Sequence, residues 1–241
     1  MNTQRKGEND DLIKKKMSKD LTLDFRHFAI DKANVSPSVI DDKIKDMVYP
    51  TIIEERDSAM RVSEMNVFSR LIQDRILFLS GQVDSISMDT MVAQMLYLNS
   101  VDNRDISLYI NSPGGDVLAG LSLIDTMNFI ESDVSTTCLG MAASMGAVLL
   151  SCGTKGKRFV LPHSRVMIHQ VSSGMQGVLK DMEIELEQTR RCKKDLYEIL
   201  SKNTNKPFEQ IEHDCDRNYW LLGQEAVDYG LADSVLIKKQ A

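Results

Sequence analysis

The sequence predicts an α/β fold in which most strands run parallel, and two consecutive segments support this prediction. Alternating apolar residues indicate a strand at residues 106–110, and a glycine turn and a helical pattern to Met127 follow it. A second segment has the same order, with a strand at residues 134–139, a turn of small residues and an apolar helix to Leu150. Repeated strand–helix alternation is typical of a parallel sheet covered by helices.

The chain is expected to consist of an N-terminal extension and one folded domain that contains these units. Residues 1–48 mix charges with isolated apolar positions, so we expect a mobile, charged N-terminal extension or propeptide there, and a folded domain over residues 49–241. Residues 66–75 suit a short amphipathic helix and residues 76–80 a buried strand. Helical spacing of five apolar residues predicts a core-facing helix; they are Met88, Met91, Val92, Met95 and Leu96.

The second half of the chain continues the alternation. Strands are expected at residues 158–161 and 165–169, and a long charged helix from about Val178 to Lys202. In α/β folds, active sites lie beyond the carboxyl ends of the strands. Four residues of interest would all fall at that edge, namely Gly114, Gly115, Ser144 and His169.

Composition narrows the function classes. The 241 residues carry a formal net charge of −6, which argues against a nucleic-acid-binding surface. The four cysteines have no C-x-x-C spacing and predict no zinc site. A signal peptide is not recognisable, and the longest apolar run falls short of the ~20 residues that cross a bilayer. We therefore expect a cytoplasmic protein that binds no metal, nucleic acid or membrane.

Ser144 is the candidate nucleophile. It lies among small residues where a strand gives way to a helix, and unpaired N–H groups at a helix start favour a developing negative charge. A buried helix rich in alanine, methionine and serine is the alternative. Serine also needs a base, and His163 and His169 are the histidines that remain when His27 in the extension and His213 in a polar segment are set aside. His169 is preferred because it ends an apolar strand and precedes a polar segment.

Three motifs resemble the proteolytic subunit of the Clp protease, the ClpP family. They are Y-I-N-S-P-G-G at residues 109–115, G-M-A-A-S-M at 140–145 and L-P-H-S-R-V-M-I-H-Q at 161–170. Their order and spacing are those of the family, and the resemblance covers about residues 50–239. It implies the repeated βαβ spiral fold that ClpP shares with the crotonases, with a protruding long helix for contact between rings.

The resemblance also implies roles for individual residues. Ser144 would be the nucleophile, His169 the general base, and the backbone N–H groups of Gly115 and Met145 the oxyanion hole. The third triad position departs from the family pattern, because C-D-R-N-Y-W places Asn218 where similar proteins usually have aspartate. An amide can orient the imidazole but cannot stabilise the imidazolium as a carboxylate does, so we expect low or conditional activity.

Other segments carry expectations from the same resemblance. Asp216 and Arg217 match the family's Asp-Arg pair that links two rings, with a plain surface ion pair as the alternative. An extended substrate would hydrogen-bond to the segment made of Gln170, Val171, Ser172 and Ser173. Five apolar residues of the long helix would interlock two rings, or else pack on their own domain: Leu179, Met182, Leu186, Leu196 and Leu200.

The expected partners follow from the family as well. Similar proteins form two stacked seven-membered rings and receive unfolded polypeptides from an AAA+ unfoldase of the ClpX, ClpA or ClpC type. Residues 50–66 would line the pore, and pockets near Tyr109 would receive the unfoldase's loops, with core filling as the alternative for Tyr109. The chain has no G-x-x-x-x-G-K-[ST] loop, so ATP would be used by the partner and no cofactor by this chain.

The sequence therefore predicts a cytoplasmic serine-type endopeptidase of an ATP-dependent protease, which acts through an acyl-enzyme on unfolded polypeptides. One alternative is a weakly active or inactive paralogue with a structural or regulatory role in a mixed ring, which Asn218 favours. A crotonase-like acyl-CoA enzyme is a further alternative. The serine and histidine motifs disfavour it, because crotonases use carboxylate bases and no nucleophile.

Overall fold

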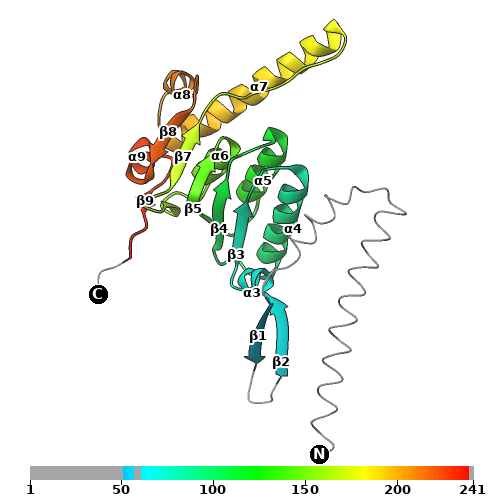
Figure 1. Cartoon of the computed structure of the whole chain (residues 1–241), viewed down its shortest axis with the longest axis vertical. Coiled ribbons are helices and arrows are strands. Elements are labelled where there is room, and N and C mark those ends of the chain that lie inside the picture. Colours follow the sequence, from blue (N-terminus) through cyan, green and yellow to red (C-terminus); the bar gives the residue numbers. More distant parts are fainter. Residues whose placement is uncertain (1–50, 57–60, 239–241) are drawn as a thin grey trace, which may run out of the picture. The chain divides into compact units, whose positions relative to one another are not determined.

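The computed structural model of the chain describes residues 51–56 and 61–238, with side chains from Val67 onward (Figure 1). The predicted extension at residues 1–48 lies outside the described residues. The chain divides into two compact units, Met1–Val67 and Phe68–Ala241. Among the described residues, no helix combines the length and the apolar character needed to cross a membrane.

The first unit contains an antiparallel hairpin. Strand β1 (Thr51–Arg56) pairs with β2 (Arg61–Asn66), in a register that runs from Thr51 opposite Asn66 to Arg56 opposite Arg61. The sequence analysis did not predict these strands, because T-I-I-E-E-R lacks the alternation of a half-buried strand. A short helix, α3 (Val67–Gln73), follows and lies within the predicted residues 66–75.

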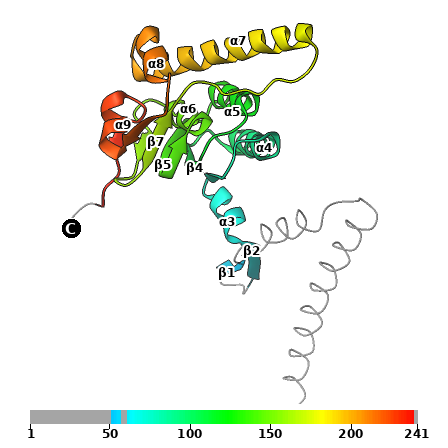
Figure 2. The same ribbon diagram turned by 45° about the horizontal axis from the view of Figure 1, so that its top comes forward.

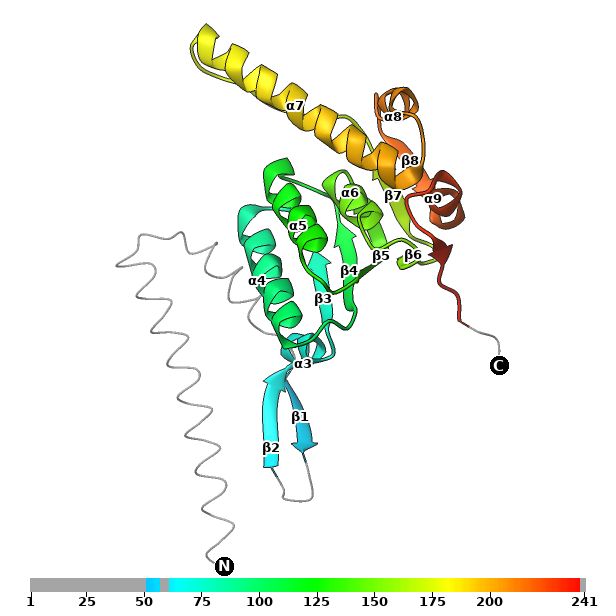
Figure 3. The same cartoon turned by 180° about the vertical axis from the view of Figure 1, so that it is seen from behind.

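The second unit is built on a parallel sheet, as predicted. Strands β3 (Ile76–Ser80), β4 (Ile106–Ser112) and β5 (Val134–Ala143) pair side by side in parallel. Helices α4 (Ser85–Val101) and α5 (Val117–Phe129) pack against each other and cover one face of β3 and β4 (Figure 3). The side chains of Asp84 and Asp116 accept backbone hydrogen bonds in the first turns of these helices and so cap them.

Strand β5 is longer than predicted, and its two halves pair with different strands. Its first half pairs with β6 (Arg158–Val160) and its last three residues pair with β7 (Arg165–Ile168), both in parallel. A register shift against β4 and the positive φ of Gly140, 75°, lie between the two halves. Helix α6 (Met145–Ser151) begins where β5 ends, beside the carboxyl end of β7.

An ion pair between the buried Arg158 and the half-buried Asp233 fastens the carboxyl-terminal strand to the sheet. Strand β9 (Ser234–Val235) pairs in parallel with β6, and Asp233 just before it binds Arg158 at 2.6 Å. The Arg158 guanidinium also donates to the carbonyl oxygens of Ser151, Asn203 and Gly230. All three nitrogens of the guanidinium are thus paired, which a buried charge requires.

The long helix α7 (Leu179–Thr204) confirms the predicted element at 178–202 and extends beyond the sheet at its amino-terminal half (Figures 1 and 3). Leu196 and Leu200 are buried in its carboxyl-terminal half, whereas Leu179 and Leu186 are exposed. Helix α8 (Phe208–Asp214) packs beside the carboxyl-terminal part of α7 (Figure 2). Of the five apolar residues predicted for this helix, those near its carboxyl-terminal end therefore pack on their own domain, and Leu179 and Leu186 do not.

Apart from β1 and β2, four elements were not predicted from the sequence: α8, β8 (Tyr219–Leu222), α9 (Gly223–Tyr229) and β9. Each has seven residues or fewer, which is too short for a clear period. Strand β8 pairs antiparallel with β7, so that Tyr219 lies opposite Ile168. This pairing brings the segment before β8 next to the segment after β7.

Candidate active site

Ser144 sits in a strained turn between β5 and α6. Its φ of 54° and ψ of −125° are rare for a residue other than glycine, and such strain costs on the order of 1–3 kcal/mol. The surrounding backbone holds this conformation, because the Ser144 N–H donates to the Met167 carbonyl at 2.8 Å and the Ser144 carbonyl accepts from Ala147 and Val148. The hydroxyl is thereby presented at the first turn of α6, as the sequence predicted.

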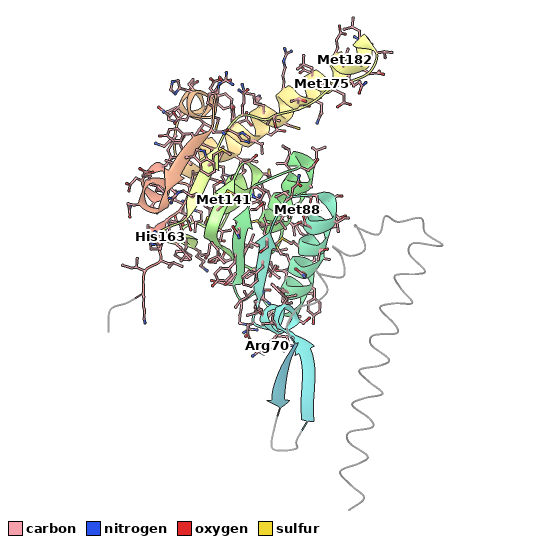
Figure 4. The ribbon with its side chains drawn as sticks, in the orientation of Figure 1. Arg70, Met88, Met141, His163, Met175 and Met182 are labelled. Carbon is pink, nitrogen blue, oxygen red and sulfur yellow. The ribbon has the colours of Figure 1, made fainter. Side chains whose placement is uncertain are left out.

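His169 follows β7 directly and lies against Ser144. The His169 Nε2 atom and the Ser144 Oγ atom are 2.8 Å apart. With a neutral ring protonated at Nδ1, Nε2 can accept the hydroxyl proton. His163, the other histidine that the sequence left open, is exposed and precedes β7 at the opposite end of that strand (Figure 4). The structure thus brings His169 to Ser144 and leaves His163 apart from it.

Gly114 and Gly115 form a tight turn beside Ser144 and His169. A Cβ atom on Gly114 would lie 2.6 Å from both the Ala143 carbonyl oxygen and the Ser144 Cβ atom, and one on Gly115 would overlap the Val83 carbonyl. Both glycines have positive φ, 90° and 154°. Val83 fixes the turn, because its N–H donates to the Gly114 carbonyl and its own carbonyl accepts from the Asp116 N–H.

The Gly115 and Met145 N–H groups both have no hydrogen-bond acceptor among the described residues. Both residues line the same cavity as Ser144 and His169. The Met145 side chain packs over Gly120 of α5, where a Cβ atom would collide with it. Two unpaired donors beside a hydroxyl are the arrangement that stabilises an oxyanion.

Asn218 lies beside His169 but forms no bond with it. Tyr219 is opposite Ile168 in the β7–β8 pairing, so the next residues outward are His169 and Asn218. Both line an open cavity of about 570 Å³, together with Asp216 and Arg217. Asn218 is exposed, and His169 Nδ1 has no hydrogen-bond partner within residues 67–238. The structure therefore joins two of the three predicted triad members and leaves the third adjacent.

The two carboxylates nearest to Asn218 in sequence have other partners. The Tyr229 hydroxyl donates to Asp214 at 2.8 Å, and Gln210 donates to it as well. Burial works to raise the pKa of Asp214, but these hydrogen bonds outweigh it and lower the pKa below its ordinary value. The exposed Asp216 carboxylate lies 3.8 Å from Arg217, and its carbonyl accepts from the Gln170 side chain. Asp214 could reach His169 only if it gave up its present hydrogen bonds.

The cavity beside Ser144 has apolar walls. Gln170, Val171 and Ser172 of the expected substrate segment line it, whereas Ser173 is exposed and lines neither of these two cavities. Sequence analysis did not assign the apolar residues to the site; they are Val117, Val148, Ile168, Leu196, Tyr197 and Leu200. The available signal was the apolar cluster at residues 196–200, in the helix α7 that contacts α6. Within the described part of the chain, no group of three or more His, Cys, Asp or Glu side chains could hold a metal ion.

Comparison with known proteins agrees with this arrangement. The sequence model of the family described as Clp protease matches residues 58–239. The "ATP-dependent Clp protease proteolytic subunit" of Bacteroides fragilis (strain YCH46) is 51% identical over 220 residues, covering 90% of this chain and 99% of that protein. The proteins of the same name from Bacteroides thetaiotaomicron and Porphyromonas gingivalis are 51% and 49% identical, with the same coverage.

Proposed function

This chain belongs to the Clp protease family, and we propose that Ser144 and His169 carry out its chemistry. It is the proteolytic subunit of an ATP-dependent Clp protease and a serine-type endopeptidase. The observation that carries the residue assignment is the 2.8 Å contact between His169 Nε2 and Ser144 Oγ, beside two unpaired backbone donors.

The reaction follows from the geometry. His169 takes the hydroxyl proton as Ser144 attacks the peptide carbonyl, and the N–H groups of Gly115 and Met145 stabilise the resulting oxyanion. His169 then gives the proton to the leaving amine, and an acyl-enzyme remains on Ser144. Water activated by His169 hydrolyses that ester. An extended substrate would run along residues 170–173, of which Gln170, Val171 and Ser172 line the cavity.

Asn218 would orient the His169 ring only after a local movement, because no hydrogen bond joins them now. This observation favours a second candidate function, a weakly active subunit that contributes structure or regulation to a mixed ring. The substitution Asn218→Asp separates the two candidates, since a carboxylate can also stabilise the imidazolium. A clear rise in peptide hydrolysis at unchanged particle mass would support a triad position for residue 218, and unchanged kinetics at several pH values would exclude it.

The family assembles into oligomeric rings that work with Clp ATPases. For this chain we propose two stacked seven-membered rings and an AAA+ unfoldase that uses the ATP, with no cofactor bound by the chain itself. The exposed apolar residues in the first half of α7, and Asp216 with Arg217, are candidates for ring-to-ring contact. Tyr109 is half-buried and stacks on Phe78, which suits an aromatic pocket for the unfoldase. A cytoplasmic location fits this role.

Purified protein tests the proposed function directly. Its mass in solution and its turnover of a fluorogenic peptide should be measured together, first alone and then with a Clp ATPase and an unfolded protein substrate. We expect a ring-sized particle whose peptide turnover disappears in Ser144→Ala. Equal turnover in the two forms, or hydration of acyl-CoA thioesters, would contradict the proposal.

A further inference from the structure

Ser112, the last residue of β4, carries a hydroxyl that the proposed mechanism does not use. The residue is fully buried and lies opposite Ala142 of β5, two positions before Ser144. Its Oγ atom accepts the backbone N–H of Gly114 at 3.1 Å. Buried N–H groups nearly always have an acceptor, and this serine supplies one at the start of the glycine turn.

The turn after Ser112 leaves one backbone donor free. Gly114 is held on both sides, since its N–H binds the Ser112 hydroxyl and its carbonyl accepts from the Val83 N–H at 2.9 Å. The Asp116 N–H donates to the Val83 carbonyl at 2.8 Å. The Gly115 N–H, which lies between these bonds, has no acceptor among the described residues. Val83 contributes backbone atoms alone, so the Ser112 hydroxyl is the group in these bonds that a substitution can remove.

Gly114 lies between the two proposed oxyanion donors. A Cβ atom on it would be 2.6 Å from the Ser144 Cβ atom and 2.9 Å from the Met145 nitrogen, and the next residue along the chain is Gly115. The glycine turn and the start of α6 therefore meet at Gly114 without an intervening side chain. A small shift of Gly114 would move the Gly115 N–H relative to Ser144. Because an oxyanion needs its donors within about 2.7–3.1 Å, such a shift would weaken its stabilisation.

The two glycines give the turn little stiffness of its own. Gly114 and Gly115 have φ values of 90° and 154°, and a residue without a Cβ atom exchanges such conformations with others at little cost. Bonds to neighbouring groups must therefore define which way each peptide group of the turn faces. The Ser112 hydroxyl supplies such a bond at the first of the two glycines.

We propose that Ser112 is a positioning residue for the oxyanion hole, whose hydroxyl holds Gly114 and thereby fixes the Gly115 N–H beside the nucleophile. It is not a catalytic residue, since it does not line the cavity beside Ser144. The inference rests on the proposed peptidase function and adds a residue on which the same site depends.

Ser112→Ala tests this role through the kcat and KM of a fluorogenic peptide. We expect kcat to fall about tenfold with KM unchanged, because oxyanion donors act on the transition state and not on the bound substrate. The fall is smaller than for a lost donor, which costs about 10²–10³-fold, because the Gly115 N–H is displaced and not removed. Ser112→Thr retains a hydroxyl and should keep kcat above that of Ser112→Ala.

The matched control is Ser151→Ala. It removes another buried hydroxyl, which is bonded to the Val148 carbonyl outside the cavity, and it should change neither constant. Unchanged kcat in Ser112→Ala, a raised KM as its only effect, or an equal fall in kcat for the control would overturn the proposal. A Ser112→Thr protein no faster than Ser112→Ala would also overturn it.

Amide hydrogen exchange separates this inference from the proposed function, because it needs no turnover. Mass spectrometry of fragments that cover residues 112–116 would follow the amides of the turn in the original chain and in Ser112→Ala. We expect exchange at Gly114 to become about tenfold faster when its acceptor is removed. Unchanged exchange would overturn the role of Ser112. If the original chain hydrolyses no peptide yet this exchange accelerates, the peptidase function fails and the role of Ser112 in the turn stands.

Discussion

The Arg158 cluster and the Ser144 site use polar groups in opposite ways. Around Arg158, the guanidinium nitrogens donate to Asp233 and to three carbonyl oxygens. Around Ser144, three groups have no hydrogen-bond partner among the described residues; they are the Gly115 and Met145 N–H groups and His169 Nδ1. The Arg158 cluster fastens β9 to β6, whereas the donors and acceptors of the Ser144 site stay available to a ligand.

The difference separates stability from function. A fully paired buried charge is costly to disturb, because removal of one partner leaves the other without compensation. Unpaired donors lower stability, and they gain their partners when a substrate or a reaction intermediate arrives. Substitutions in the first cluster should therefore change unfolding, and substitutions in the second should change activity.

The largest expected effect is on catalysis. Ser144→Ala should lower kcat by up to about 10⁶-fold, as loss of a nucleophile does in serine proteases. Its free energy of unfolding should stay within about 0.5 kcal/mol of the parent, because the hydroxyl contributes little packing. Peptide hydrolysis and chemical unfolding measure the two quantities. Ser122→Ala, on the exposed face of α5, is the matched control and should change neither.

The second effect is on stability. Arg158→Met should lower the free energy of unfolding by about 3–5 kcal/mol, because the Asp233 carboxylate is left without its partner. Urea unfolding followed by circular dichroism measures this loss. Activity per folded molecule should hardly change. A stable Arg158→Met protein with impaired kcat would break the division between the two regions.

The third effect concerns the oxyanion donor. Gly115→Ala should lower kcat by about 10²–10³-fold, because the new Cβ atom meets the Val83 carbonyl and displaces the Gly115 N–H. Steady-state kinetics with a fluorogenic peptide measures it. Gly174→Ala, with no atom within 4 Å of the new Cβ and no positive φ, is the control. Equal kinetics for the two alanine variants would remove Gly115 from the site.

The smallest effect is a pH dependence of stability. Burial works to raise the pKa of Asp233, but its bonds to Arg158 outweigh this and lower the pKa below the ordinary value. A lowered folded-state pKa gives stability that is present above the unfolded value of about 3.9 and is lost as the pH falls through the folded value. Thermal unfolding between about pH 5 and 2 should show this loss. Asp233→Asn should be less stable at neutral pH and less dependent on pH over that range.

The parallel strands and long helices were predictable because their patterns are local. β3 was predicted at its observed bounds, and α7 to within two residues at its carboxyl end, since burial imposes clear periods on them. The Ser144 turn and the place of His169 after β7 followed from strand ends. Short elements such as β8 escaped prediction, because their pairing with a distant strand decides their structure.

Two features of the site depend on tertiary structure alone. The sequence placed Asn218 behind His169 by resemblance, but only the β7–β8 pairing shows the two residues adjacent and unbonded. Ser112 carried no functional signal of its own, although it lies in the motif at residues 109–115. The contact of Gly114 with the Ser144 turn exists only once α6 packs beside the two glycines.

Labelling with a fluorophosphonate probe tests the central claim most directly, since the probe reacts only with an activated serine. After incubation of the assembled particle, mass spectrometry of its peptides should locate the adduct on Ser144. The labelling rate should fall sharply in His169→Ala and stay unchanged in His163→Ala. A particle with its Clp ATPase bound that leaves Ser144 unmodified, or carries the adduct on another serine, would contradict the account.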